Sequence, residues 1–152
     1  MDYTIRAGVK EDVPAALNLI KELAVFEKEP DAVLVTEEEL LNDGFGKKPL
    51  YGLLVAEHEG VVVAISLYYY RYSTWKGKCL YLEDLVVTET MRGKGVGSAL
   101  FEATLNQAKE DGCRKMNWQV LDWNTPAIEF YKKYNAELDG EWINGSITIR
   151  EK

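Results

Sequence analysis

A glycine-rich loop between a predicted strand and a predicted helix is the feature that most constrains how this chain can fold. Residues 79–87 are apolar enough for a buried strand, and residues 97–111 place apolar side chains on one helical face, with Gly112 as the helix stop. Gly93, Gly95 and Gly97 lie between the two. A further strand is expected at residues 115–120. This order predicts a βαβ unit, in which a helix joins two parallel strands.

The rest of the chain is predicted to complete an α/β fold. Asp12 is the expected N-cap of a helix at residues 13–27, and Thr36 with Glu39 forms a capping box before a short helix that ends at residues 43–44. Strand patterns flank Glu59-Gly60 and Asn144-Gly145, where we expect hairpin turns. We expect a mixed, mainly antiparallel sheet flanked by helices, in a single domain over residues 1–152. The other expected elements are strands at residues 4–7, 53–57 and 61–72 and a helix at residues 125–134.

The charge balance limits the ligands that this chain is expected to bind. It carries 25 acidic and 18 basic side chains, a formal net charge of −7. This sign disfavours nucleic acid and anionic membranes and favours a cationic ligand, although an acidic surface also simply maintains solubility. The apolar runs are too short for a bilayer span, and no signal-peptide core or zinc spacing is visible. A cytoplasmic protein is expected, with Cys79 and Cys113 as free thiols and no metal site.

The loop from Arg92 to Ser98 has the composition of a phosphate cradle. Its glycines leave backbone N–H groups unobstructed, the helix N-terminus adds partial positive charge, and Arg92 and Lys94 supply cations. A P-loop does not fit because no Lys-Ser/Thr pair follows a glycine. A dinucleotide fingerprint does not fit because the three glycines are spaced two and two. A tight turn without any ligand remains an alternative.

The pattern that remains, R-x-x-G-x-G after a strand, resembles motif A of the GNAT acetyltransferases, which binds the CoA pyrophosphate. Residues 123–131 are similar to motif B of that family, and residues 5–7 are similar to its opening strand. Residues 43–46 (DGFG), 81–84 (YLED) and 121–124 (LDWN) are similar to the spermidine/spermine (diamine) acetyltransferases, and most to their thialysine-acetylating branch. Together these motifs cover nearly the whole chain.

The resemblance implies acetyl-CoA as the co-substrate and direct transfer of its acetyl group to a primary amine in a ternary complex. It also implies a homodimer, with neither nucleic acid nor a membrane as partner. Backbone groups after Asp84 would hydrogen-bond the pantetheine arm and polarise the thioester carbonyl. The implied CoA contacts are Leu85, Val86, Val87, Arg92, Gly93, Lys94, Gly95, Val96, Gly97, Ser98, Asn124, Thr125, Pro126 and Ala127.

Two residues are the expected acid–base catalysts. An amine attacks a thioester only when neutral, whereas lysine-like amines have a pKa of about 10.4. Glu83, beside motif A, is the best candidate to remove this proton, through water or helped by burial, because a free carboxylate is a weak base. Tyr131 matches the general acid of the family, which protonates the departing thiolate. As alternatives, Glu83 and Asp84 form a solvated strand end and Tyr131 belongs to the core.

The amine itself is predicted from one departure from the polyamine pattern. Polyamine acetyltransferases carry an acidic residue where this chain has Ser73, so an ion-pair partner for a distal ammonium is missing. We therefore expect thialysine or a lysine-like amino acid to be preferred over spermidine and spermine. The alternatives are a broad small-amine enzyme and a non-catalytic acyl-CoA-binding domain. We expect Trp75, Trp118, Trp123 and the tyrosine run 68–70 to pack against the sheet rather than to form a cation cage. The implied substrate contacts are Glu27, Ser73, Glu83, Asp84, Asn117, Trp118 and Gln119.

Overall fold

The structure, a computed structural model, describes residues 2–150 of the chain. It forms two compact units, Met1–Trp118 and Gln119–Lys152. Whether these units make up the single domain expected from the sequence stays a prediction. Within the described residues, no helix is both long and apolar enough to cross a membrane.

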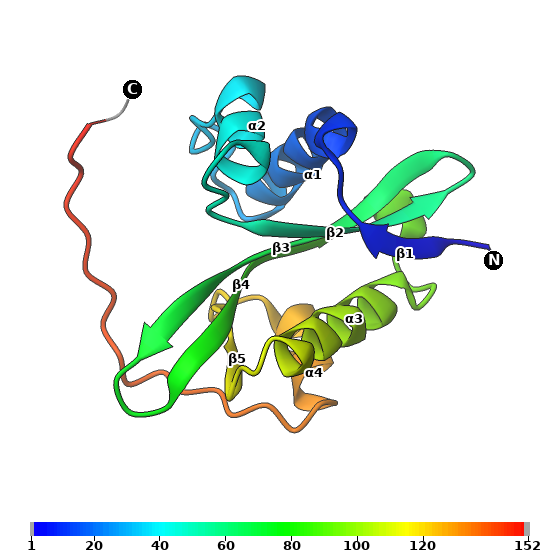
Figure 1. The fold of residues 1–152 in the computed structure, drawn as a ribbon. Helices are drawn as coiled ribbons and strands as arrows, with labels where there is room; N and C mark the ends of the chain where they lie inside the picture. Colours follow the sequence, from blue (N-terminus) through cyan, green and yellow to red (C-terminus); the bar gives the residue numbers. More distant parts are fainter. Residues whose placement is uncertain (1, 151–152) are drawn as a thin grey trace. The chain divides into compact units, whose positions relative to one another are not determined.

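A five-stranded sheet in the order β1-β2-β3-β4-β5 forms the centre of the described part of the first unit (Figure 1). The pairs β1–β2, β2–β3 and β3–β4 are antiparallel, whereas the pair β4–β5 is parallel. The predicted mixed, mainly antiparallel sheet and its βαβ unit are therefore confirmed. The strands are β1 Thr4–Ala7, β2 Gly52–His58, β3 Val61–Ser73, β4 Gly77–Val87 and β5 Lys115–Asn117.

The predicted turn between β2 and β3 is also confirmed. Glu59 and Gly60 have φ angles of 51° and 78°, so both lie in the left-handed region. Two consecutive left-handed residues give the turn that matches the natural twist of a two-stranded hairpin.

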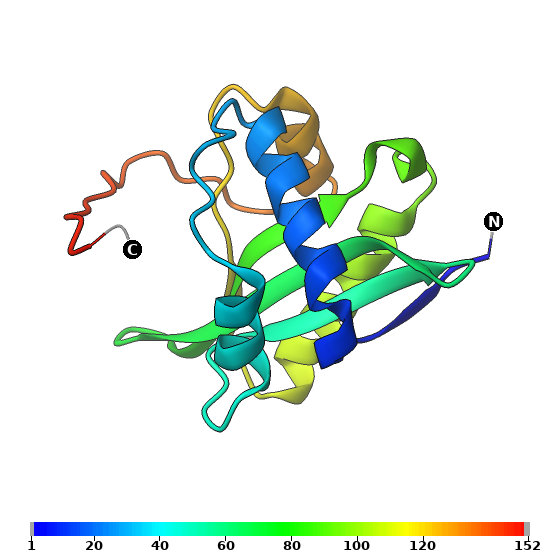
Figure 2. The same ribbon diagram turned by 90° about the horizontal axis from the view of Figure 1, so that it is seen from above.

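Helices cover both faces of this sheet. α1 (Val13–Phe26) and α2 (Glu37–Phe45) lie on one face, and α3 (Val96–Glu110) lies on the other (Figures 1 and 2). On the α1 face, Ala16 and Leu19 pack against apolar side chains of β2, β3 and β4. On the α3 face, the hydroxyl of Ser66 lies 2.7 Å from that of Thr104, and both residues are fully buried.

The two predicted helix caps differ in outcome. Thr36 accepts a hydrogen bond from the Glu39 N–H at 3.1 Å, as the capping box predicts, and α2 continues to Phe45. Asp12 stands at the predicted N-cap position of α1, but its side chain makes no cap bond there. It binds the Arg6 guanidinium and accepts from the Val9 N–H instead, because Arg6 on β1 offers a stronger, charged partner.

The last predicted strand of the first unit is shorter than expected. β5 pairs with β4 only as far as Tyr81↔Asn117, whereas the sequence predicts a strand to residue 120. The pairing stops two residues before Glu83, where β4 leaves its regular register. A bulge bends its strand and increases the local twist, which separates the two backbones beyond this point.

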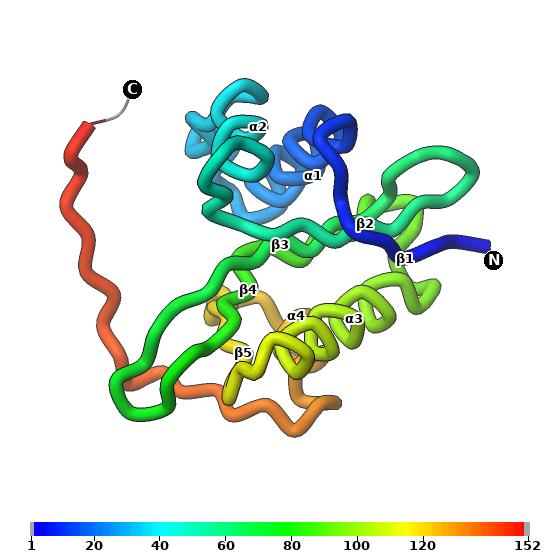
Figure 3. The backbone as a smooth tube through the Cα atoms, viewed as in Figure 1, coloured from blue at the N-terminus to red at the C-terminus, as the bar shows by residue number. Residues whose placement is uncertain are grey.

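The second unit contains one helix in its described part, α4 (Thr125–Lys132), which ends two residues before the predicted boundary. The predicted closing hairpin around Asn144-Gly145 is wrong: residues 133–150 contain no strand, and the chain follows an irregular path (Figure 3). Trp142, Ile143, Ile147 and Ile149 are exposed. The local pattern favours strands, but a strand also requires a paired neighbour, and none is present within residues 119–150.

Candidate functional site

The glycine loop connects β4 to α3 through a short 3-10 turn, Glu89–Met91. Gly93 and Gly95 have φ angles of 76° and 84°, in the left-handed region that a side chain would disfavour. A Cβ atom added at either glycine would meet no other atom within 4 Å. Gly95 is the N-cap of the 15-residue helix α3, with no side-chain cap bond to its N-terminus. An anion can therefore approach the open helix N-terminus directly.

The two cations of this loop are placed differently. Lys94 is exposed. Arg92 turns back toward β4 and α1: its Nε donates to the Val87 carbonyl at 3.0 Å, and its Nη2 lies 3.6 Å from Glu22 Oε2. The Glu22 Oε1 atom accepts from the Thr88 hydroxyl at 2.9 Å. Arg92 thus ties the end of β4 to α1, a contact that the motif alone does not indicate.

A β-bulge in β4 brings Glu83 and Asp84 onto the same face of the sheet. The register runs Tyr69↔Tyr81, then Tyr68↔Leu82, and then shifts to Leu67↔Asp84, so Glu83 has no partner on β3. Side chains alternate between the faces of a regular strand, and one extra residue breaks that alternation. Asp84 shares the face of Leu67, which packs against α1. Glu83 shares the face of Tyr69 and Tyr81. Tyr69 lies two residues from Leu67 on β3, so this is also the face that packs against α1.

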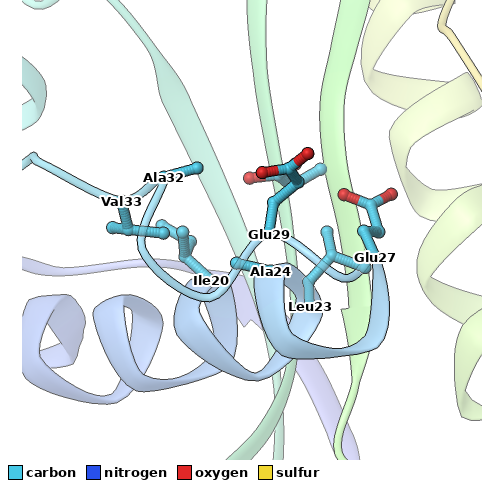
Figure 4. A pocket seen from close by; sticks show the side chains of 8 residues that line it. Ile20, Leu23, Ala24, Glu27, Glu29, Ala32 and Val33 are labelled. Atoms are coloured by element: carbon cyan, nitrogen blue, oxygen red, sulfur yellow. The ribbon is translucent and has the colours of Figure 1, made fainter.

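A pocket of about 190 Å³ lies between the end of α1, the segment that follows it, and β4. Figure 4 shows the carboxylate of Glu27 at the end of α1 and that of Glu29 on the segment that follows, beside the apolar side chains of the wall. Asp84 lines the same pocket. The full lining is Ile20, Leu23, Ala24, Glu27, Glu29, Ala32, Val33 and Asp84.

Burial changes the acidity of two of these carboxyl groups. It raises the pKa of Glu27. For Asp84, burial together with the negative charges of Glu83 and Glu27 raises the pKa to about 6. A carboxylate in this position gains by binding a cation, because an opposite charge relieves both the burial and the repulsion. The pocket is therefore suited to an ammonium group.

Glu83 has a different environment from its neighbour. It is exposed, and it lies close to the aromatic pair Tyr69 and Tyr81, whose ring centroids are 5.2 Å apart. Burial raises the pKa of Tyr69 and of Tyr81, and in both cases the charge of Glu83 adds to the effect. The Arg71 guanidinium lies 5.4 Å from the centroid of the Tyr81 ring. Glu83 thus borders solvent on the pocket side of the sheet.

The second unit holds the motif B residues. Asn124 caps α4, its Oδ1 accepting from the Ala127 N–H at 3.4 Å, and Pro126 stands in the first turn. Tyr131 is buried, with its ring edge-on to Phe130 at 5.4 Å. Glu83 belongs to the first unit and Tyr131 to the second. The meeting of these two side chains at one thioester stays a prediction.

The remaining predicted substrate contacts are spread over both units. Ser73 ends β3, and its hydroxyl accepts from the N–H groups of Trp75 and Lys76 at 3.2 and 3.0 Å, which closes the β3–β4 turn. Asn117 ends β5. Trp118 packs edge-on against Phe101 at 5.5 Å, and Gln119 donates to Asn144 at 3.1 Å.

The predicted aromatic residues differ in burial. Tyr68 is buried and Trp118 packs against Phe101, as expected. The expectation is wrong for Trp75, which is 87% exposed at the hairpin tip. Sequence reasoning missed Glu29 in the pocket wall and Glu22 beside Arg92. The sequence offered only a weak signal for these two residues: Glu22 lies within the predicted helix at residues 13–27, and Glu29 lies just after it.

Comparison with known proteins supports the family resemblance that the sequence motifs indicate. The sequence profile described as "Acetyltransferase (GNAT) family" matches residues 14–136. A thialysine N-epsilon-acetyltransferase from Bos taurus is 42% identical over 141 residues, which cover 88% of this chain and 83% of that protein. A spermidine/spermine N(1)-acetyltransferase-like protein 1 from Homo sapiens is 38% identical over 144 residues, which cover 90% of this chain and 21% of that protein.

A solved structure shows the same fold at lower sequence similarity. An aminoglycoside N-acetyltransferase in complex with CoA superposes with a TM-score of 0.77 at 20% identity, covering 96% of this chain and 95% of that one. This structure confirms the predicted fold. The predicted branch is confirmed by the thialysine and spermidine/spermine relatives.

Proposed function

Because the chain belongs to the GNAT acetyltransferase family, we propose that it acetylates a primary amine of a small cationic substrate, with acetyl-CoA as donor. The observation that carries this proposal is the acidic pocket beside the β4 bulge, where Glu27 and Asp84 face a space of about 190 Å³. The relatives named as thialysine acetyltransferases act on one such amine. Their names are those of enzymes, which disfavours the alternative of a non-catalytic binding domain.

The glycine loop of the first unit suits the pyrophosphate of acetyl-CoA. The open space over Gly93 and Gly95 and the uncapped start of α3 suit a pyrophosphate, and Lys94 adds an exposed positive charge. Backbone groups of Leu85 to Val87 would hold the pantetheine arm, and the Asn124–Ala127 turn of the second unit would contribute further contacts. When bound, acetyl-CoA supplies an activated acetyl group as a thioester.

The acid–base roles follow from the chemistry of amine acetylation. The substrate enters as an ammonium ion and must lose one proton before its nitrogen can attack. Glu83, exposed at the bulge, would pass this proton to solvent through a bound water molecule. The Tyr131 hydroxyl would give a proton to the leaving sulfur, since a phenol and a thiol have similar pKa values. Both substrates must be bound together for this direct transfer.

The pocket also bears on which amine is bound. Its carboxylates can hold a single ammonium group, and its apolar wall of Leu23, Ala24 and Val33 suits a short aliphatic or thioether chain. Ser73, at the tip of the β3–β4 hairpin, provides no charge for a second, distant ammonium. We therefore propose that thialysine or a lysine-like amino acid has a higher kcat/KM than spermidine or spermine.

Acetyl transfer to a panel of amines tests this function. Purified protein should acetylate thialysine in preference to spermine, and Tyr131→Phe should lower kcat far more than it raises KM. Glu83→Gln should cost about 10²-fold near neutral pH. If no amine in the panel is acetylated, the proposed function is wrong; if spermine equals or exceeds thialysine, only the substrate preference is wrong.

Calorimetry with CoA tests the glycine loop separately. Gly95→Val should weaken CoA binding because its branched side chain enters the open space and disfavours the left-handed backbone. Gly140→Val is the matched control, since Gly140 also stands in open space but has no left-handed φ, and it should bind CoA as the wild type does. Equal affinity in all three proteins would remove the cradle assignment. A homodimer and a cytoplasmic location stay predictions that the family resemblance implies.

A further inference from the structure

Two adjacent carboxylates of β4 face the same side of the sheet in different environments. Glu83 is exposed, whereas Asp84 is partly buried and lines the pocket at the end of α1. In a regular strand these side chains would point to opposite faces; the bulge places both toward α1. The structure therefore offers two candidates for the proton acceptor, and the sequence pattern alone selected the more exposed one.

The groups around Asp84 come from three segments. Glu27 at the end of α1 and Glu83 on its own strand are the charged groups that act on its carboxyl, and both are negative. Glu29, from the segment after α1, lines the same pocket. The rest of the wall is apolar, from Ile20, Leu23 and Ala24 on α1 to Ala32 and Val33. An ammonium group entering this pocket would meet Asp84 at the wall formed by β4.

We propose that Asp84 accepts the proton of the substrate ammonium directly, and that Glu27 sets how readily it does so. This inference rests on the proposed function, which it deepens by naming the acceptor. Glu83 then has a secondary role, at the exposed edge where a proton leaves Asp84 for solvent.

Each bond that forms in this transfer is matched by one that breaks. An ammonium N–H bond breaks and its proton forms an O–H bond on the Asp84 carboxylate. The freed nitrogen lone pair forms a bond to the acetyl carbonyl carbon, which gives a tetrahedral intermediate whose nitrogen still carries two hydrogens. As the intermediate collapses, the C–S bond breaks, the sulfur takes the proton of the Tyr131 hydroxyl, and the nitrogen gives its second proton to water. After the products leave, Asp84 gives its proton to solvent and Tyr131 regains one from solvent, so that each acetylation releases one proton overall.

The raised pKa of Asp84 supports its role as the proton acceptor. An ordinary carboxylate lies about six pKa units below an alkylammonium group, so it accepts the proton only rarely. With the pKa of Asp84 raised to about 6, the gap narrows to roughly four units. Burial and the charges of Glu83 and Glu27 cause this rise, so removing the Glu27 charge should lower it again.

Profiles of kcat/KM against pH, with thialysine as the amine and saturating acetyl-CoA, test the proposal. The wild type should lose activity below about pH 6, where Asp84 becomes protonated. Asp84→Asn should be about 10²- to 10³-fold slower at pH 7. Its rate should then rise about tenfold per pH unit toward the pKa of the amine, because the neutral amine no longer needs an acceptor. Glu27→Gln should move the acid limb to lower pH.

Matched variants separate this role from a structural one. Glu29→Gln removes the same charge from the same pocket and should leave the acid limb where the wild type has it. Thermal melting and CoA affinity of Asp84→Asn should show a folded protein that still binds CoA. The inference is overturned if the Asp84→Asn profile runs parallel to the wild type, or if Glu83→Gln alone abolishes the acid limb. A wild type that acetylates no amine would overturn the proposed function as well.

Discussion

The two ends of α1 hold acidic clusters of opposite character. At its start, Asp12 is only 6% exposed, and the Arg6 guanidinium binds both of its oxygens, at 2.8 and 3.0 Å. These hydrogen bonds, with that from the Val9 N–H, hold the pKa of Asp12 below its usual value. Beside its end, Asp84 faces only negative charges, and its pKa rises to about 6. Asp12 is buried and Asp84 is partly buried, but of these two only Asp12 forms an ion pair among the described residues.

This difference separates a group that stabilises the fold from one that is available to a ligand. Arg6 also binds Glu57 on β2 at 2.7 Å, so one guanidinium joins β1, β2 and the start of α1. Within residues 2–150, none of the ion pairs involves Glu27, Glu29 or Asp84, so their charges are available to a cationic ligand. Strongly shifted pKa values occur in both kinds of cluster, and the partner distinguishes them.

The largest expected effect follows from removing the cation at the start of α1. Arg6→Met should lower the free energy of unfolding by about 3–5 kcal/mol at neutral pH, because Asp12 is then buried as an unpaired charge. The depressed pKa means that this stabilisation is full above the unfolded-state pKa and is lost as the pH falls, so the deficit should shrink below about pH 4. Urea unfolding at several pH values measures it.

An exposed ion pair provides the control for this variant. Lys132 and Glu129 lie 3.5 Å apart on the surface of α4, and Lys132→Met should cost less than about 0.5 kcal/mol. Equal losses in the two variants would show that the buried cluster has no special weight.

The second prediction has the opposite sign. Asp84→Asn should stabilise the fold by about 3 kcal/mol at most at pH 8, because ionising a group whose folded pKa is raised costs stability. The gain should disappear as the pH falls below about 4, where Asp84 is protonated in both states. Together with the loss of activity expected above, this would be a trade of stability for function. A destabilised Asp84→Asn protein at pH 8 would contradict the unpaired environment assigned here.

Glu22, between the two ends of α1, should show an intermediate effect. Its carboxylate has partial compensation, a hydrogen bond from Thr88 at 2.9 Å and Arg92 at 3.6 Å. Glu22→Gln should therefore cost about 1 kcal/mol of unfolding free energy, less than the loss at Arg6. Glu102→Gln, an exposed glutamate of α3, should change it by less than about 0.5 kcal/mol. Chemical denaturation at pH 7 compares the two.

The smallest effect is expected from adding a carboxylate outside both clusters. Ser73→Asp can keep the turn at the hairpin tip, since a carboxylate oxygen accepts the same two N–H bonds from Trp75 and Lys76. Its charge should raise kcat/KM for spermine relative to thialysine by up to about fivefold, the value of one exposed ion pair of about 1 kcal/mol. Ser73→Asn keeps the turn without the charge and should leave the ratio unchanged. Equal ratios in both variants would remove Ser73 as a selectivity position.

Much of the fold could be predicted because its signals are local. The capping box at Thr36, the Glu59-Gly60 turn and the glycine loop before α3 each depend on residues within a few positions of one another. The predictions that failed depend on distant partners. The strand to residue 120 and the hairpin at Asn144-Gly145 have suitable residues, but a strand forms only where another backbone pairs with it.

The same distinction between local and distant interactions applies to the candidate site. The sequence by itself determined the glycine loop, the motifs of the family and the presence of Glu27, Glu83 and Asp84, because these depend on residue type and spacing. Only the tertiary structure decided which carboxylates face one pocket. The β4 bulge turned Glu83 and Asp84 to the same face, α1 delivered Glu27 to Asp84, and Arg6 was placed beside Asp12. Burial and neighbouring charge set the chemistry of a carboxyl group, and both arise only when segments distant in sequence are packed together.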